Sequence, residues 1–270
     1  MRWGRIIRGR SLYEKYPRPR PIKHFDSVLG LSGIAEGAHG VFYVAGANTT
    51  LDNISDPPTN ATHIWEVDFT KNSHHPHAKL LCRPGAPTEF NGMAASNETI
   101  VLASASYQDS IFAIDTKTGY TWEAMKQTSL MSNINSIKVS DGYFYDKVTA
   151  GTGQLIFQGS ACDDFAISPK GFTLNSTFGS EYKFAYLATA AGNSIEQVTF
   201  TKNGTAVGHE IIAGAEDPTE VVEPTGVFFG RDEGELNKIY VTTGSARAAN
   251  VDVNGTDVAV GAQLLEIRLS

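Results

Sequence analysis

Apolar and polar residues alternate with a period of two along most of the chain, and turn residues interrupt this alternation at short intervals. Successive side chains of a β-strand point to opposite faces, so a period of two predicts strands, and Gly, Asp and Asn are typical of the turns between them. The clearest runs are residues 41–45, 63–68, 100–104, 111–115, 184–188 and 238–242. Residues 115–119 and 140–142 have the Asp and Gly of tight hairpin turns. No stretch keeps a helical period over three turns, so the pattern predicts an all-β protein.

A five-residue phrase recurs within this pattern. Each copy opens with a small polar residue, usually followed by Gly or Ser, and then continues with alternating apolar positions. The copies are residues 32–36, 91–95, 135–139, 163–167 and 225–229. A repeated supersecondary unit of this kind predicts blades around an axis, in which the opening polar residues converge where the inner strands begin. Function is therefore expected at the axis.

Composition and charge narrow the class of protein. A chain of 270 residues with 41% hydrophobic residues can bury a sizeable core, and we expect residues 1–270 to form one propeller domain. The net charge of −7 and the pI near 5.5 disfavour nucleic acid or an anionic membrane as partner. No apolar run approaches transmembrane length, and the basic start lacks the apolar segment of a signal peptide.

Glycosylation sequons are frequent in the chain. Seven of the fourteen asparagines lie in Asn-x-Ser/Thr sequons: Asn48, Asn53, Asn60, Asn97, Asn175, Asn203 and Asn254. This excess suggests a glycoprotein of the secretory pathway or the extracellular space, although no signal peptide is recognisable in the chain. Accidental sequons in a Thr-rich β-protein are the alternative.

The cysteines and a histidine tract offer weaker signals. Cys82 and Cys162 form either one disulfide, in an oxidising compartment, or two buried thiols, and two cysteines alone make no metal site. Residues 74–77 contain three histidines, but Pro76 and the polar residues before them predict a solvated hairpin turn.

Four phrases, in this order along the chain, resemble the fungal branch of the senescence-marker-protein/gluconolactonase family. They are residues 90–94, 134–145, 163–167 and 223–231. The resemblance covers the chain from about Leu29 onward and implies a six-bladed β-propeller. It also implies a divalent ion, often calcium, which inner strands hold through a Glu, an Asn and an Asp, with a further Asn near the substrate.

Residue by residue, the resemblance assigns Asn135 and Asp163 to the metal and Asn91 to the substrate. Oxygen donors of this kind suit a hard cation, which in a hydrolytic member would polarise a lactone carbonyl while a carboxylate activates water. Asn91, Asn135 and Asp163 are otherwise residues that cap strands and turns.

Two departures from the family pattern change the expected chemistry. No phrase before Leu29 matches the one that carries the metal-binding Glu, so we expect the first blade to be incomplete and the metal shell to lack a ligand. In addition, Asn135 and Asp163 are only 28 residues apart, whereas a four-stranded blade needs roughly 40 residues or more.

The fungal branch includes natural-product enzymes that guide cyclisation, among them hetero-Diels-Alder reactions that form tropolone-sesquiterpenoid ethers. Such chemistry needs no metal or other cofactor, but it needs a dry, aromatic-lined cavity with one or two hydrogen-bond donors. We expect a cyclase of this type, with a small hydrophobic substrate, and candidate catalytic residues Asn91, Asn135, Asp163, Tyr107 and Gln108. The alternatives are a lactonase dependent on calcium or another divalent metal, and a binding propeller without catalysis.

Overall fold

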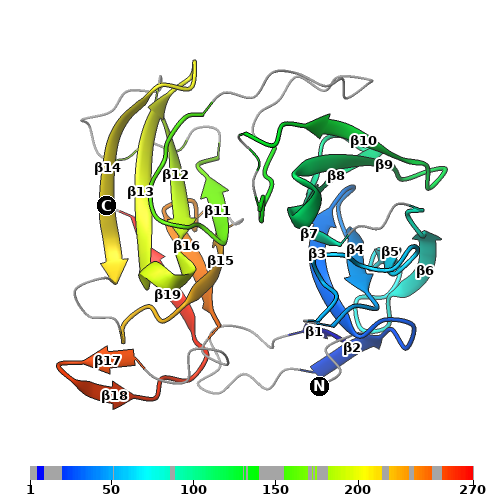
Figure 1. Cartoon of the computed structure of the whole chain (residues 1–270), viewed down its shortest axis with the longest axis horizontal. Helices are drawn as coiled ribbons and strands as arrows, with labels where there is room; N and C mark the ends of the chain where they lie inside the picture. Colours follow the sequence, from blue (N-terminus) through cyan, green and yellow to red (C-terminus); the bar gives the residue numbers. More distant parts are fainter. Residues whose placement is uncertain are drawn as a thin grey trace. The chain divides into compact units, whose positions relative to one another are not determined.

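The structure is a computed structural model, and two compact units, Met1–Thr152 and Gly153–Ser270, make up the chain. Strands dominate both units (Figure 1). In the described ranges the only helices are two three-residue 3-10 turns, and neither is long and apolar enough to span a membrane. The structure describes residues 5–8, 20–50, 52–85, 89–129, 131, 133–139, 155–169, 172, 174, 182–214, 219–230, 234–244 and 251–269.

The first unit contains two four-stranded antiparallel sheets. The first sheet is formed by β3 (Gly30–Glu36), β4 (Val41–Ala47), β5 (Thr62–Asp68) and β6 (His77–Cys82). The second is formed by β7 (Phe90–Ala95), β8 (Ile100–Ala105), β9 (Ser110–Asp115) and β10 (Thr121–Lys126), with the turn η1 (Ser106–Gln108) between β8 and β9. A separate two-stranded sheet pairs β1 (Arg5–Arg8) with β2 (Arg20–His24).

The second unit has one four-stranded and one three-stranded sheet. The four-stranded sheet is formed by β11 (Asp164–Ile167), β12 (Tyr182–Ala188), β13 (Ser194–Thr201) and β14 (Ala206–Gly214), with η2 (Ala190–Gly192) before β13. The three-stranded sheet is formed by β15 (Pro224–Phe229), β16 (Lys238–Thr243) and β19 (Leu264–Arg268). Between β16 and β19 lies the hairpin of β17 (Val251–Val253) and β18 (Thr256–Val258).

Within each four-stranded sheet the strands are neighbours in the order of the sequence, which is the meander of a propeller blade. The all-β prediction is confirmed, and each of the six runs predicted as strands lies within a strand. The hairpin at residues 115–119 is confirmed too, because Asp115 Oδ1 accepts the backbone N–H groups of Lys117 and Thr118. The hairpin expected at residues 140–142 lies outside the described residues.

The expected number of blades is wrong. The described residues form four sheets of the blade kind rather than six, and before Gly30 they form only the two-stranded sheet of β1 and β2. The phrase that opens at Asn135 begins no strand in the described ranges 133–139 and 155–163. The physical reason is chain length, since the 28 residues between Asn135 and Asp163 are fewer than the roughly 40 that a blade needs.

Each unit has its own hydrophobic core between its two sheets. In the first unit, Ile64 from one sheet packs with Phe90, Val101 and Ile114 from the other. In the second, Tyr186 and Ile195 pack against Ile239. All these side chains are buried, and each contributes about 1.5–3 kcal/mol by leaving water. The alternating runs of the sequence supply this core from one face of each sheet.

The repeated phrase coincides with an irregularity of the strands. The pairing of β3 with β4 shifts between Leu31 and Ile34, and the pairing of β7 with β8 shifts between Phe90 and Met93. The pairing of β15 with β16 shifts in the same way at Thr225. β-Bulges bend a strand and change the direction of its side chains. In these three sheets the bulge lies at the opening polar residue of the phrase.

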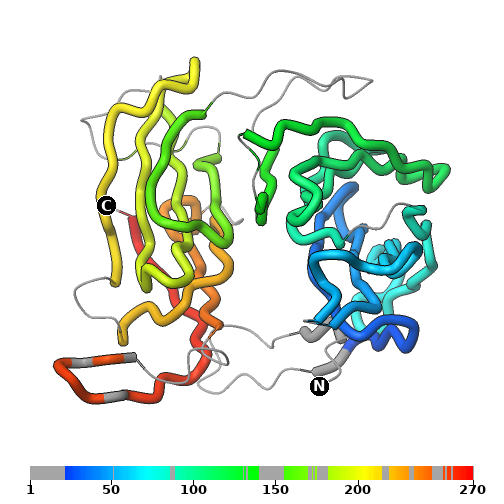
Figure 2. Tube along the Cα trace, in the orientation of Figure 1, coloured from blue at the N-terminus to red at the C-terminus, as the bar shows by residue number. Residues whose placement is uncertain are grey.

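The glycine that follows this polar residue lets neighbouring backbones approach closely. A Cβ atom at Gly33 would lie 2.5 Å from the Asn91 carbonyl oxygen, and one at Gly92 would lie 2.7 Å from that of Asn135. Figure 2 shows β3 beside the start of β7 within this unit. A side chain at Gly33 would push β3 and β7 apart, and one at Gly92 would push β7 away from the segment that contains Asn135.

The two cysteines are free thiols, Cys82 in the first unit and Cys162 in the second. Burial raises the pKa of Cys82 to about 11. Burial and then the charges of Asp164 and Asp163 raise the pKa of Cys162 to about 12. Both side chains are therefore protonated thiols at neutral pH. Residues 74–76 of the histidine tract lie in the exposed turn that was predicted, where Asn72 caps the backbone of His74, and His77 begins β6.

Replacing Gly92 with Ala should destabilise the first unit strongly. The added Cβ would meet three backbone atoms of residues 135–137, including Ser136 Cα at 2.6 Å, so we expect a loss of about 1–3 kcal/mol in the free energy of unfolding. Urea unfolding followed by circular dichroism measures it. Gly30→Ala is the matched control because no atom lies within 4 Å of the added Cβ. Equal stability of the two variants would contradict the close approach.

Candidate functional site

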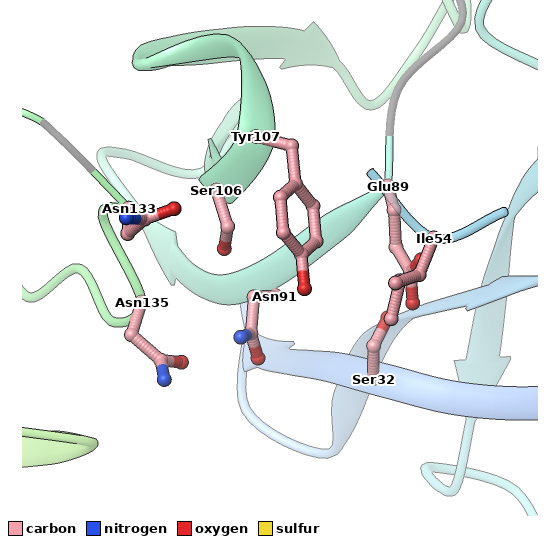
Figure 3. Close-up of a pocket in the computed structure, with 8 residues that line it drawn as sticks. All are labelled: Ser32, Ile54, Glu89, Asn91, Ser106, Tyr107, Asn133 and Asn135. Atoms are coloured by element: carbon pink, nitrogen blue, oxygen red, sulfur yellow. The ribbon is translucent and has the colours of Figure 1, made fainter. Parts of the chain in front are cut away.

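The first unit contains a cavity of about 280 Å³ where its inner strands begin. Figure 3 shows its side chains, which come from both sheets, from η1 and from three connecting segments. Six of the eight lining residues are uncharged and polar, one is acidic and one is aliphatic. They are Ser32, Ile54, Glu89, Asn91, Ser106, Tyr107, Asn133 and Asn135.

The repeated phrase supplies three of these side chains. Ser32, Asn91 and Asn135 are the opening polar residues of three successive phrases, and the structure brings all three to one cavity. Ser32 and Asn91 lie at the bulges of β3 and β7, where pairing with the neighbouring strand is interrupted. The bulge therefore turns each polar side chain out of the ladder and toward the cavity.

Hydrogen bonds fix the segment that carries Asn133 and Asn135. The carbonyl oxygen of Asn135 accepts the Gly92 N–H at 2.8 Å and the Ser104 hydroxyl at 2.6 Å. One residue earlier, the carbonyl of Ile134 accepts the Ser106 hydroxyl at 2.7 Å. Because Ser104 is fully buried and Ser106 nearly so, these bonds are shielded from water. They hold the side chains of Asn133 and Asn135 at the cavity, although residues 133–139 belong to no sheet.

The two residues predicted from the loop after β8 have different positions. Tyr107 lines the cavity, and its hydroxyl points toward the space between Asn91 and Glu89 (Figure 3). Its side chain is 44% exposed, so a bound molecule can cover it. Gln108 is not among the lining residues, and its Oε1 atom is buried without a hydrogen-bond partner in the described part of the chain.

Glu89 is the acidic residue of the cavity, and the sequence analysis missed it. It is partly buried just before β7, and its Oε2 atom accepts the Thr49 hydroxyl at 3.0 Å. Burial raises the pKa of the Glu89 carboxyl above its ordinary value, and the hydrogen bond from Thr49 opposes that rise. A carboxyl with a raised pKa in a cavity is a candidate acid or base.

One sequence signal could have found Glu89. It precedes Asn91 by two residues, and residues i and i+2 of an extended chain lie on the same face. The phrase that positions Asn91 therefore also positions Glu89. Thr49 and Ile54 had no such signal, because the loop between β4 and β5 brings them to the cavity from a distant part of the sequence.

Asp163 belongs to the second unit and is not among the residues of this cavity. It lies at the start of β11, where its backbone N–H donates to the carbonyl of Ala188 at 2.8 Å. The neighbouring Asp164 carboxylate accepts the backbone N–H of Val227 on β15 at 3.3 Å. In the part of the chain that the structure describes, no group of three His, Cys, Asp or Glu side chains could hold a metal ion.

Comparison with known proteins gives likenesses at the level of fold. No protein-family model matches the chain, and no curated protein matches its sequence. Among solved structures, a luciferin-regenerating enzyme is 11% identical with a TM-score of 0.41 and aligns with 93% of this chain. Regucalcin, a calcium-binding protein from Agrobacterium tumefaciens strain C58, is 10% identical with a TM-score of 0.37 and aligns with 78%. Virginiamycin B lyase from Staphylococcus aureus is 14% identical with a TM-score of 0.32 and aligns with 86%.

The alignments span 66% of the luciferin-regenerating enzyme chain, 52% of the regucalcin chain and 54% of the lyase chain. These neighbours are β-propellers of the regucalcin-like and virginiamycin B lyase kinds. All three TM-scores lie below 0.5, and it is the strand order within the sheets that identifies them as blades.

Replacing Glu89 with Gln should stabilise the first unit at neutral pH. The folded state binds the carboxyl proton more tightly than the unfolded state because the folded pKa is raised. Stability is therefore lost as the pH rises from the unfolded value near 4.5 through the folded pKa. Gln cannot ionise and can still accept the Thr49 hydroxyl, so it escapes this loss. Urea unfolding at pH 3.5 and pH 7 should show a gain at pH 7 only, and a gain of equal size at both would contradict the assignment.

Replacing Thr49 with Val should raise the pKa of Glu89 further. The hydroxyl stabilises the carboxylate, and Val has the same shape without the donor. NMR titration of the Glu89 side-chain carboxyl carbon measures the change directly. Thr49→Ser retains the donor and should leave the titration near that of the parent. An unchanged titration in Thr49→Val would contradict the hydrogen bond.

Proposed function

We propose that the cavity of the first unit is the active site of an enzyme that opens the ring of a small, oxygen-rich lactone. The observation that carries this proposal is Glu89, a partly buried carboxyl with a raised pKa, set among the amide groups of Asn91, Asn133 and Asn135. General bases work best when their pKa is near the working pH, and amide N–H groups stabilise the oxyanion of an attacked carbonyl.

The reaction uses these groups in two steps. Glu89, as carboxylate, takes a proton from water while the water oxygen attacks the lactone carbonyl carbon. Side-chain amides at the cavity donate hydrogen bonds to the oxygen that becomes negative. When the ring C–O bond breaks, Glu89 returns its proton to the departing alkoxide, and the product is a hydroxy acid. The cavity volume of about 280 Å³ suits a substrate of the size of a single sugar ring.

A divalent ion fits the described residues of this cavity poorly. Calcium takes six to eight oxygen ligands, and its affinity rises with the number of carboxylates. Among the eight residues that line the cavity, Glu89 alone has a carboxyl group. No step of the proposed reaction passes through a metal, and the chelator arm of the experiment below tests this part of the proposal.

The lining favours a polar substrate over the hydrophobic one that the sequence suggests. Tyr107 is the only aromatic residue and Ile54 the only aliphatic residue among the eight that line the cavity. Amide and hydroxyl groups both donate and accept hydrogen bonds, and an oxygen-rich molecule offers partners for both kinds.

A cyclisation, such as a hetero-Diels-Alder reaction of the fungal natural-product branch, is the second candidate. It is favoured by the same amide donors, which would polarise an electron-poor partner, and by the exposed ring of Tyr107, on which a planar substrate could stack. This candidate needs Asn91 and Tyr107 but no proton transfer by Glu89.

Turnover of an aldonolactone, followed as acid release, tests the proposal. We expect Glu89→Gln to reduce kcat by roughly 10²–10⁴-fold, the usual contribution of a general base. Asn91→Ala should reduce it by roughly 10²–10³-fold through the loss of an oxyanion donor. Glu98→Gln is the matched control, since Glu98 is an exposed glutamate in the turn after β7 and should leave the rate unchanged.

The same assay with chelator, and a parallel assay with a quinone-methide precursor and an alkene, separate the alternatives. Lactone turnover that chelator abolishes would replace the metal-free step with a metal-dependent one. Cycloaddition that persists in Glu89→Gln, without lactone turnover, would favour the cyclase. Binding of the lactone without turnover of either substrate would make the protein a binding propeller and overturn the proposal.

A further inference from the structure

The described glycosylation sequons all have similar positions in the fold. The structure describes six of the seven acceptor asparagines, and all six lie in turns or loops rather than in strands. Asn175 lies outside the described residues. Four of the six acceptors are exposed, namely Asn48, Asn60, Asn203 and Asn254. Asn53 and Asn97 are partly buried, and their Oδ1 atoms accept backbone N–H groups of their own turns.

Four other asparagines contact the cavity or a neighbouring segment of the fold. Asn91, Asn133 and Asn135 line the cavity, and Asn193 accepts the backbone N–H of Glu223. None of these four is followed by Ser or Thr two positions later. Attachment of a glycan would fill the cavity at Asn91, Asn133 or Asn135, or break the part-buried contact of Asn193. Four of the six described sequon asparagines thus lie where the fold has room for an oligosaccharide.

The loop between β4 and β5 carries two of the exposed acceptors at its base. The Asn48 N–H donates to the carbonyl of Ala61 at 3.0 Å, which brings Asn48 next to Asn60 in space. The same loop contacts the cavity through Thr49 and Ile54. Both acceptor side chains are exposed while these two reach inward, so the loop presents one face to solvent and one to the cavity.

We propose that Asn48 and Asn60 carry N-linked oligosaccharides, which cover the outer face of the loop that walls the cavity. Asn203 and Asn254, both in exposed hairpin turns, are the corresponding sites of the second unit. In the transfer, Asn Nδ2 forms a bond to the anomeric carbon of the sugar and loses one proton. The bond from that carbon to the pyrophosphate of a lipid-linked donor breaks, and the lipid pyrophosphate leaves. The reaction requires passage of the chain through the secretory pathway.

The experiment uses the full chain, secreted from a eukaryotic host. Enzymatic removal of N-glycans in ¹⁸O-water converts each glycosylated Asn into a labelled Asp, and peptide mapping locates the label. We expect label at Asn48 and Asn60. Asn72 and Asn237, which lie in turns but have no sequon, are controls within the same protein and should be unlabelled.

Two variants of Thr50 test the assignment of Asn48. Thr50 is exposed and completes the Asn48 sequon, so Thr50→Ala should remove the label from Asn48 and leave that of Asn60. Thr50→Ser retains a sequon and should retain the label. Secreted protein in which Asn48 and Asn60 are both unlabelled would overturn the proposal. The readout is chemical, so it is independent of any activity of the cavity.

Discussion

The close packing of backbones at two glycines is the constraint on which the first unit depends. Gly33 lies against the carbonyl of Asn91, and Gly92 lies against Asn135 and Ser136. A hydrogen atom is the only side chain that fits these contacts. Because the inner strands approach so closely, the two sheets can bury a common core that includes Phe90 and Ile64. The same approach brings the polar residue before each glycine to one place.

The cavity follows from this packing together with local irregularity of the strands. A regular strand would direct Ser32 and Asn91 along the pleat, but the bulges of β3 and β7 interrupt the ladders at these residues. Segments outside the sheets contribute further residues to the cavity. The β4–β5 loop supplies the donor to Glu89, and η1 supplies Tyr107. The rigid part of the site is thus built on strands and its chemistry is completed by loops.

For the proposed reaction, the partial burial of Glu89 has opposite effects on stability and on basicity. Its partial burial raises the pKa of the carboxyl, which costs stability at neutral pH and also makes the group a better base. The hydrogen bond from Thr49 limits that cost. A cavity with one such carboxyl among neutral amides can transfer a proton without the repulsion that a second nearby carboxylate would introduce.

The second unit contains a similar arrangement of a glutamate and a β-bulge at the start of β15. Glu223 precedes Thr225 by two residues, as Glu89 precedes Asn91, and Thr225 likewise lies at a bulge. The backbone of Glu223 has a φ of 49°, and its N–H is held by Asn193 at 2.9 Å. Similar sequence phrases thus give similar strand starts. The neighbouring residues differ, since Thr49 contacts Glu89 whereas Asn193 contacts Glu223.

The sequence by itself determined the all-β class, six of the strands and the turn at Asp115, because these depend on local periodicity and turn chemistry. Asn91, Asn135 and Tyr107 were instead predicted from the repeated phrase and the family resemblance, and the structure describes all three at the cavity. The number of blades was not determined in this way, since a phrase such as that at Asn135 can open a blade only if enough chain follows it. Only the tertiary structure decided that Glu89, Thr49 and Ile54 meet at the cavity and that Gln108 does not line it. Contacts between residues far apart in the sequence depend on how sheets and loops pack, so no local pattern predicts them.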